Sequence, residues 1–320
     1  MLALFYWGTT MPSIILIDAN SVGYAGQHAA DLKTGDQPTQ AIYNSLVALR
    51  NQRSLDPTAR IFYLWDSRAQ FRFDILPSYK GKRSDTPEKV KAKEEYHSQQ
   101  PFIEKMVGLL GIDQIRIDGF EADDVAYQMT KRFVAKGYKV KLVSSDKDWL
   151  QMLLSPDVSW YDPRLDRSCN LNFFDDFTGY DRIDHFVAAK CIEGDTSDNI
   201  DGVPGLGEKA CKLIFSRWDS ISEMVKEYRA TGGFTKELLG PDFSRHLKKL
   251  NAFCANEGGA MEIYIRNQRL INLARAPEIP NIQFIQGKPD ELGFFDACGE
   301  LAFLSITGKP APWINAFFAR

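Results

Sequence analysis

The chain has 320 residues, of which 44% are hydrophobic and 25% charged, and its net charge is −3. Such proportions are those of an ordinary globular protein, and the length suffices for one large α/β domain with a smaller domain appended. No stretch approaches the roughly 20 apolar residues of a membrane helix, so we expect a cytoplasmic protein of a bacterium or a phage-infected cell that has no membrane partner. The five cysteines are widely spaced without a CxxC pair, which argues against a zinc site or a disulfide framework.

The first half of the chain alternates segments that look like strands with segments that look like helices. Strands are predicted at 13–18, 60–66, 112–118 and 138–146, and helices at 38–53, 101–111 and 119–137. This alternation predicts an α/β fold with a mostly parallel, doubly wound sheet. Met11 directly precedes the first strand, and the ten residues before it carry no charge, so we expect them to be dispensable.

The segment 67–100 is polar and basic, with few apolar side chains for a core. Within it, residues 79–93 hold six Lys or Arg against two acidic residues, a local positive charge that suits a nucleic acid. The chain after about residue 180 has helical patterns at 181–193, 207–218, 219–229 and 242–256. We therefore divide the chain into an α/β catalytic domain (11–180), a helical domain (181–275) and a C-terminal tail of unassigned role (276–320).

Acidic residues stand where three of the predicted strands end. Asp18 ends the first strand, Asp66 the second, and Asp146 and Asp148 follow the last. The carboxyl ends of parallel strands form the ligand crevice of an open α/β sheet, so these side chains are expected to converge. Five more acids open the helix at 119–137 or lie in the Gly- and Asp-rich connection 194–210: Glu121, Asp123, Asp124, Asp195 and Asp198.

Each of these acids has a simpler explanation when it is taken alone. A single Asp after a strand is usually a turn or N-cap residue, and acids in a first helical turn usually serve the helix dipole. Nine carboxylates near one edge, however, repel each other unless cations neutralise them. Oxygen ligands without His or Cys favour Mg²⁺ or Mn²⁺, and two such ions about 4 Å apart commonly catalyse phosphodiester cleavage.

Five motifs in this order resemble the bacterial and bacteriophage 5′ nucleases, which include the 5′-nuclease part of DNA polymerase I and the stand-alone phage flap endonucleases. They are LIDAN (16–20), FRFDILPSYKGKR (71–83), GFEADDVA (119–126), SSDKDW (144–149) and GDTSDNIDGVPGLGEKA (194–210). The resemblance covers about residues 13–275. It implies a PIN-like core, a helical arch at about 67–100 and a helix–three-turn–helix DNA-binding domain. It also implies metal-dependent 5′–3′ exonuclease and flap-endonuclease activity in replication and repair.

Carried over residue by residue, the resemblance implies two Mg²⁺ sites, which Mn²⁺ would also occupy. The first would use Asp18, Asp66, Glu121, Asp123 and Asp124, and the second Asp146, Asp148, Asp195 and Asp198, some of them through water. At the base of the arch (79–83), Lys80 and Arg83 would contact the scissile phosphate and Tyr79 would stack on the terminal base. Lys82, in the same motif, is assigned to DNA binding.

The resemblance also implies that the 194–210 connection binds duplex DNA. Gly202, Gly205 and Gly207 would allow close backbone approach to a phosphate, with further contacts from Lys209 and Lys212 and a bridging K⁺ held by loop carbonyls. The expected partner is DNA with a free 5′ end or a 5′ flap, with RNA–DNA hybrids as a second substrate. With no polymerase domain in the chain, a monomeric phage-type enzyme is the nearer relative.

Two alternatives stay open from the sequence. A metal-dependent ribonuclease could use a related acidic α/β scaffold, although the simpler scaffold lacks the 194–210 motif. A structure-specific DNA-binding protein without catalysis would not need the complete set of acids. Metal-dependent turnover of a 5′-flap oligonucleotide separates catalysis from binding alone.

Overall fold

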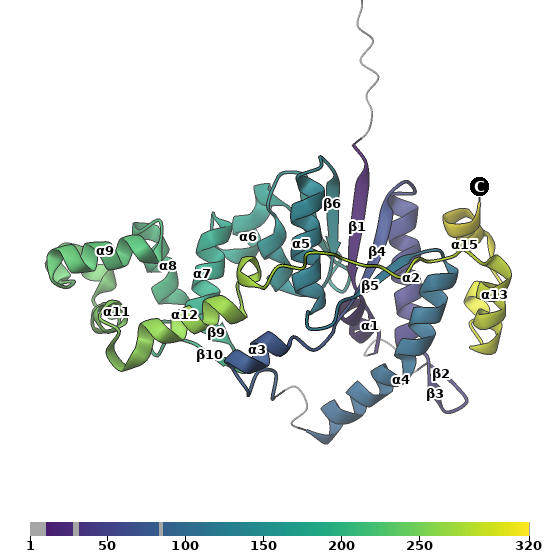
Figure 1. Ribbon diagram of the computed structural model, residues 1–320, viewed down its shortest axis with the longest axis horizontal. Helices are drawn as coiled ribbons and strands as arrows, with labels where there is room; N and C mark the ends of the chain where they lie inside the picture. The colour runs from purple at the N-terminus through teal and green to yellow at the C-terminus, as the bar shows by residue number, and fades with distance from the viewer. Residues whose placement is uncertain (1–10, 28–31, 83–85, 320) are drawn as a thin grey trace, which may run out of the picture.

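The computed structural model describes residues 11–27, 32–82 and 86–319, so the predictions made for residues 1–10 and for Arg83 lie outside the described residues. At its centre is a six-stranded sheet in the order β5-β4-β1-β6-β7-β8, parallel except for the last pairing (Figure 1). The strands are β1 (Ser13–Asp18), β4 (Arg60–Trp65), β5 (Asp113–Arg116), β6 (Lys139–Val143), β7 (Val158–Asp162) and β8 (Arg167–Cys169). The four predicted strands and the doubly wound α/β class are confirmed, whereas β7 and β8 were not predicted.

Strand β1 shows how the sheet is buried on both faces. Ile14 and Leu16 belong to one hydrophobic cluster and Ile15 and Ile17 to the other, as alternation along a strand requires. The chain runs from β1 to β4 and β5 on one side and then returns to place β6 on the other side. The switch point is therefore between β1 and β6, where ligands of such sheets bind.

Helices cover both faces of the sheet. One face is packed by α5 (Ala122–Val134) and by the 3₁₀ helix η1 (Lys147–Met152). The other is packed by α1 (Ala19–Gln27), α2 (Gln40–Leu55) and the second half of α4 (Pro87–Leu109). A small hairpin of β2 (Lys33–Thr34) and β3 (Gln37–Pro38) precedes α2.

The segment 67–100 is more ordered than its polar composition predicts. It contains α3 (Gln70–Ile75) and the first half of α4, which runs on through Pro101 where the sequence predicts a helix start. Thr86 caps α4 with its hydroxyl, and Pro87 occupies the first turn, where its missing N–H costs nothing. Tyr96 and Gln99 are fully buried, so the prediction that segment 67–100 is too polar to form a core is wrong for this part of it.

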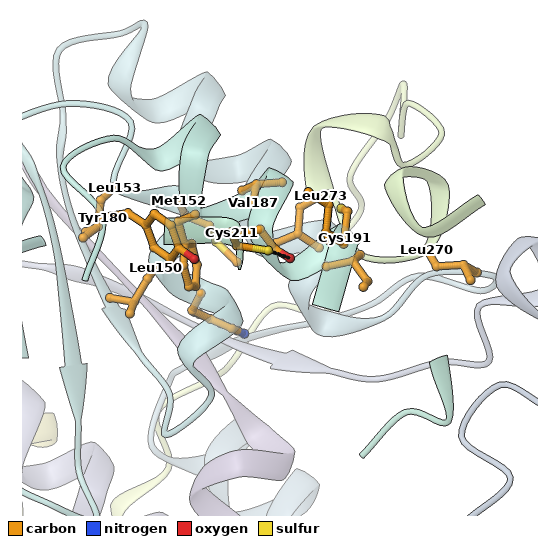
Figure 2. Packing of buried hydrophobic residues seen from close by; sticks show 14 of the residues in the cluster. Leu150, Met152, Leu153, Tyr180, Val187, Cys191, Cys211, Leu270 and Leu273 are labelled. Carbon is orange, nitrogen blue, oxygen red and sulfur yellow. Dashed lines mark hydrogen bonds between the residues drawn. The ribbon is translucent and has the colours of Figure 1, made fainter. Parts of the chain in front are cut away.

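The helical region lies beyond one end of the sheet (Figure 1). It contains α7 (Ile183–Glu193), α8 (Glu208–Arg217), α9 (Ile221–Thr231), α10 (Lys236–Leu239), α11 (Leu247–Cys254) and α12 (Ala260–Leu270), with short elements α6 (Phe174–Thr178), β9 (Gly194–Asp195), β10 (Ile200–Asp201), η2 (Leu171–Phe173), η3 (Pro241–Phe243), η4 (Glu257–Gly259) and η5 (Leu273–Arg275). Figure 2 shows Leu150 and Met152 of η1 packed with Val187 and Cys191 of α7 and with Leu273. One hydrophobic cluster thus spans both regions and fixes them to each other.

The C-terminal tail returns to the α/β region and packs on it (Figure 1). Ile285 forms an antiparallel bridge with Gln114 at the outer edge of β5. Phe294 and Trp313 are buried in the cluster on the α2 and α4 side, and Arg50 of α2 lies 5.2 Å above the Trp313 ring. The tail's helices are α13 (Glu291–Glu300), α14 (Leu304–Thr307), α15 (Ala311–Trp313) and the π-helical turn η6 (Ile314–Phe318). No helix in the described ranges has the length and apolar character needed to cross a membrane.

Candidate metal centre

The predicted acidic residues at the β1–β6 switch point lie around Asp18. Its side chain is buried, and it accepts hydrogen bonds from the Ser21 amide (2.9 Å) and the Ser144 hydroxyl (2.8 Å). Asp66, which directly follows β4, accepts from the Asn20 amide (2.5 Å) and from the Ala122 backbone N–H at the start of α5 (2.8 Å). The ends of β1 and β4 and the beginning of α5 therefore meet at one point.

Helix α5 begins with three of the predicted acids. Glu121 is its buried N-cap and receives hydrogen bonds from the Tyr79 hydroxyl (2.9 Å) and the Lys80 ammonium (2.5 Å). Asp123 accepts from the Trp149 indole N–H at 2.6 Å. Asp124 is fully buried and differs from these two, because both its oxygens are bound by a single arginine, Arg72, at 2.6 and 2.7 Å. The structure therefore gives Asp124 an ion-pair partner, Arg72.

The second predicted set gathers at the entry to the helical region. Lys190 of α7 donates to Asp148 and lies 3.9 Å from Asp195. Asp195 also accepts from the Ser197 amide (2.8 Å) and hydroxyl (2.6 Å). Asp198 accepts from the Tyr79 hydroxyl at 3.1 Å. The Tyr79 hydroxyl therefore contacts one carboxylate of each predicted set, Glu121 of the first and Asp198 of the second.

Tyr79 and Lys80 lie between the two sets of carboxylates. The Tyr79 ring is only 3% exposed and packs edge-on against Phe73, so it has no open face on which a base could stack, and the stacking predicted for Tyr79 is not available in this structure. Lys80 adopts a left-handed backbone (φ 56°), and its N–H donates to the Asp198 carbonyl at 2.8 Å. Lys82, by contrast, is exposed.

Mutual repulsion and burial shape the ionisation of the cluster. Burial, helped by the nearby Asp66, raises the pKa of Asp18 to about 7. The pKa of Asp123 is raised well above its usual range by burial and by Asp146 and Asp18. Reduced hydration raises the pKa of Asp146, with Asp198 and Asp195 adding to the rise and Lys190 opposing it. The pKa of Asp195 is lowered although burial opposes it, because Ser197 and Lys190 stabilise its charge.

The donor set fits hard divalent cations. All the predicted ligands are carboxylates, and the raised pKa values of Asp18 and Asp123 express a local deficit of positive charge that cations would relieve. In the described part of the chain no three of these side chains converge on a common point at ligand distance. Instead, the ammonium groups of Lys80 and Lys190 pair with two of the carboxylates, Glu121 and Asp148. These lysine side chains must move away from the carboxylates before metal ions can bind there.

In the 194–210 connection, two of the three glycines occupy positions that a larger residue could not take without strain. A Cβ on Gly202 would lie 2.0 Å from the Glu193 carbonyl oxygen, and Gly205 has a φ of +81° with Lys249 packed over it. Gly207 has open space around it and is the N-cap of α8. Lys209 and Lys212 are exposed on α8, and Lys212 pairs with Glu208 at 2.8 Å.

Several residues of the site were not predicted from the sequence. Asn20, Ser144 and Trp149 orient carboxylates by donating hydrogen bonds to them. All three lie inside the motifs LIDAN and SSDKDW, and that position in the sequence could have identified them. Arg72 and Lys190 reach acids that are 52 and 42 positions away in the sequence. A local pattern carries no information about such contacts.

The pKa of Asp18 predicts how stability depends on pH. Because that pKa is about 7 in the folded protein and 3.8 ordinarily, the folded state binds more protons between these values, and stability falls as the pH rises from about 4 to 7. Asp18→Asn should therefore raise the melting temperature in EDTA at pH 8, by on the order of 5 °C. Mg²⁺ should stabilise the parent protein more than the variant. Calorimetry that shows no gain for Asp18→Asn would contradict this electrostatic account.

Comparisons with known proteins agree with this geometry. The profile of the family "5′-3′ exonuclease, N-terminal resolvase-like domain" matches residues 13–178. DNA polymerase I of Mycobacterium tuberculosis is 31% identical over 237 residues, and the thermostable DNA polymerase I of Thermus aquaticus is 30% identical over 216. These matches cover 71% and 67% of this chain but 25% of each polymerase, so the chain spans about a quarter of their length.

Among solved structures, a bacteriophage T5 5′-exonuclease with bound zinc ions has a TM-score of 0.64 at 19% identity, with 95% of this chain and 97% of that chain covered. The T5 flap endonuclease in a pseudo-enzyme–product complex with DNA and metal ions has a TM-score of 0.62 at 20% identity, with coverage of 95% and 98%. Human GEN1 bound to Holliday junction DNA has a TM-score of 0.62 at 14% identity, with coverage of 96% and 74%. These likenesses show the fold, and the profile match, which covers more than half of the chain, shows that it belongs to the 5′–3′ exonuclease family.

Proposed function

We propose that this chain is a divalent-metal-dependent 5′–3′ exonuclease and structure-specific flap endonuclease that hydrolyses DNA near free 5′ ends. The observation that carries the proposal is that hydrogen bonds link carboxylates from the sheet edge, from the start of α5 and from residues 194–198. Family membership supports hydrolysis of phosphodiester bonds as the reaction. A role in replication and repair follows from the relation to DNA polymerase I.

The cofactor we propose is Mg²⁺, with Mn²⁺ as a substitute. Asp18, Asp66, Glu121 and Asp123 would hold one ion, and the second would be held by Asp146, Asp148, Asp195 and Asp198. When bound, the ions supply acidity to the attacking water and positive charge for the phosphoryl oxygens. One structural neighbour from bacteriophage T5 has divalent zinc ions bound, and another has DNA and metal ions bound.

The chain's own side chains would orient the ligands and the phosphate. Asn20 and the Ala122 amide hold Asp66, and Ser144 holds Asp18. The Lys80 side chain is 19% exposed and pairs with Glu121 at 2.5 Å. Once cations neutralise Glu121, the Lys80 ammonium can turn to the scissile phosphate and stabilise the charge that develops there.

The helical region would hold the duplex. The first turn of α8, with Lys209 and Lys212 exposed beside it, can bind phosphates with its backbone amides. Such contacts carry no base information, so binding is independent of sequence. We also propose a K⁺ on the carbonyls of the 202–207 loop, RNA–DNA hybrids as a second substrate, and action as a monomer.

The arch leads to a test of the proposed function. Residues 78–80 are joined to the 194–199 connection by bonds from Lys80 N–H to the Asp198 carbonyl and from the Asn199 amide to the Ser78 carbonyl, both 2.8 Å. We propose that a strand reaching the carboxylates passes the arch and enters by its free 5′ end. A bulky protein attached to the 5′ end of a flap before the enzyme is added should slow cleavage strongly, by about 100-fold if threading limits the reaction.

The matched experiment adds the same block after the enzyme has bound in Ca²⁺, before Mg²⁺ starts the reaction. That order should slow single-turnover cleavage much less. Equal rates for pre-blocked and free flaps would exclude threading, and the absence of any Mg²⁺-dependent cut would exclude the proposed function itself.

A further inference from the structure

Arg72 joins three parts of the chain that the sequence keeps far apart. It lies in α3, its side chain is 3% exposed, and it contacts the first turn of α5 and the last turn of α12. Its two terminal nitrogens bind the two oxygens of Asp124 at 2.6 and 2.7 Å. Its Nε donates to the carbonyl of Leu270 at 2.9 Å. Every nitrogen of the guanidinium therefore has a partner.

On the α5 side, these bonds determine where Glu121 lies. Asp124 Oδ2 accepts the Glu121 backbone N–H at 3.1 Å, so the carboxylate held by Arg72 also holds the N-cap of α5. The Arg72 Nη1 atom lies 3.4 Å from Glu121 Oε2. A planar fork is required to bind both oxygens of Asp124 at once, and a lysine at this position would supply one point charge instead.

On the α12 side, the same arginine is linked to the second set of carboxylates. Asn267 of α12 donates from its amide to the carbonyls of Cys191 and Asp201, both at 2.9 Å, and Arg266 donates to the Asp201 carbonyl at 2.9 Å. Helix α12 therefore holds the end of the connection that carries Asp195 and Asp198. Arg72 binds the C-terminal carbonyl of that helix, where a cation is favoured by the helix dipole.

We propose that Arg72 is a positioning residue that sets Glu121 relative to the carboxylates of the 194–198 connection, so that both sets face the same phosphate. This inference rests on the proposed function. Stability alone is a weak reason for such a pair, because apolar residues of similar volume often replace buried ion pairs without loss. Partners behind metal ligands, in contrast, commonly control affinity and rate.

The test is Arg72→Lys, with Arg60→Lys as a matched control. Arg60 also binds an aspartate, Asp113, through Nε (3.0 Å) and Nη2 (2.6 Å), at the β4–β5 edge. We expect Arg72→Lys to weaken Mn²⁺ binding in calorimetry and to slow single-turnover cleavage of a 5′-flap oligonucleotide, each by about 10- to 100-fold. Its Kd for the same DNA in Ca²⁺ should stay within about threefold, because the phosphate contacts lie elsewhere. Arg60→Lys should change none of these values.

Parental Mn²⁺ affinity and rate in a folded Arg72→Lys would overturn the proposal. Should that variant unfold, the pair Arg72→Met with Asp124→Leu removes both charges and keeps the packing. A folded pair variant with the same loss of Mn²⁺ affinity supports positioning, whereas parental affinity overturns it. A parent that binds Mn²⁺ without cutting flap DNA would refute the proposed function and leave the calorimetric test of Arg72 valid. A parent that binds no Mn²⁺ would refute both.

Discussion

Asp146→Asn should lower single-turnover cleavage of a 5′-flap oligonucleotide by about 1000-fold, because a catalytic metal contributes several kcal/mol to the transition state and each ~1.4 kcal/mol is tenfold in rate. Asp146 lies three positions after the end of β6 as the N-cap of η1, and its charge interacts with Asp195 and Asp198. Binding of the same DNA in Ca²⁺ should persist or tighten, because the change removes negative charge and no phosphate contact. The rate is measured by quenched flow and binding by fluorescence anisotropy.

Asp157→Asn is the control for this variant. Asp157 is an exposed aspartate at the opposite end of the sheet, just before β7, and the same chemical change there should leave the rate unaltered. Cleavage by Asp146→Asn at the parental rate would remove Asp146 from the proposed second metal site. A loss of DNA binding that equals the loss of rate would assign it to substrate binding.

Lys80→Ala should slow the single-turnover rate by about 100-fold, which is the usual effect of removing one fixed donor from a developing negative charge. The Kd for the flap substrate should rise much less, because the ammonium acts on the transition state. Lys80→Arg, which retains the charge, should recover part of the rate.

Lys105→Ala serves as the control, since Lys105 is an exposed lysine in the second half of α4, where the helix packs on the sheet. An unchanged rate together with a raised Kd for Lys80→Ala would identify Lys80 as a phosphate anchor. The ion pair of Lys80 with Glu121 at 2.5 Å adds a second readout. Removal of the ammonium should weaken the competition for Glu121, so that less Mg²⁺ is needed for half-maximal rate.

The part of the fold that follows a local pattern was predictable. The buried run of β1 and the alternation of strands with helices determine a parallel sheet, and Asp18 and Asp66 come to one edge because parallel strands end together. The tail was not predictable in this way. Phe294 and Trp313 are buried only because the chain returns to α2 and α4, and no periodicity in residues 276–320 specifies that return.

The same distinction between local pattern and long-range packing applies to the residues of the metal site. The acidic residues and their order could be read from the sequence, because each stands beside a strand end, a helix start or a glycine turn. Their partners could not. Lys190 meets Asp148, Arg72 meets Asp124, and the Tyr79 ring is buried where stacking on DNA was predicted. These contacts join residues 42 or more positions apart, so only the packing of α3, α7 and α12 around the sheet decides which carboxylates remain open to a metal and which are neutralised by the chain itself.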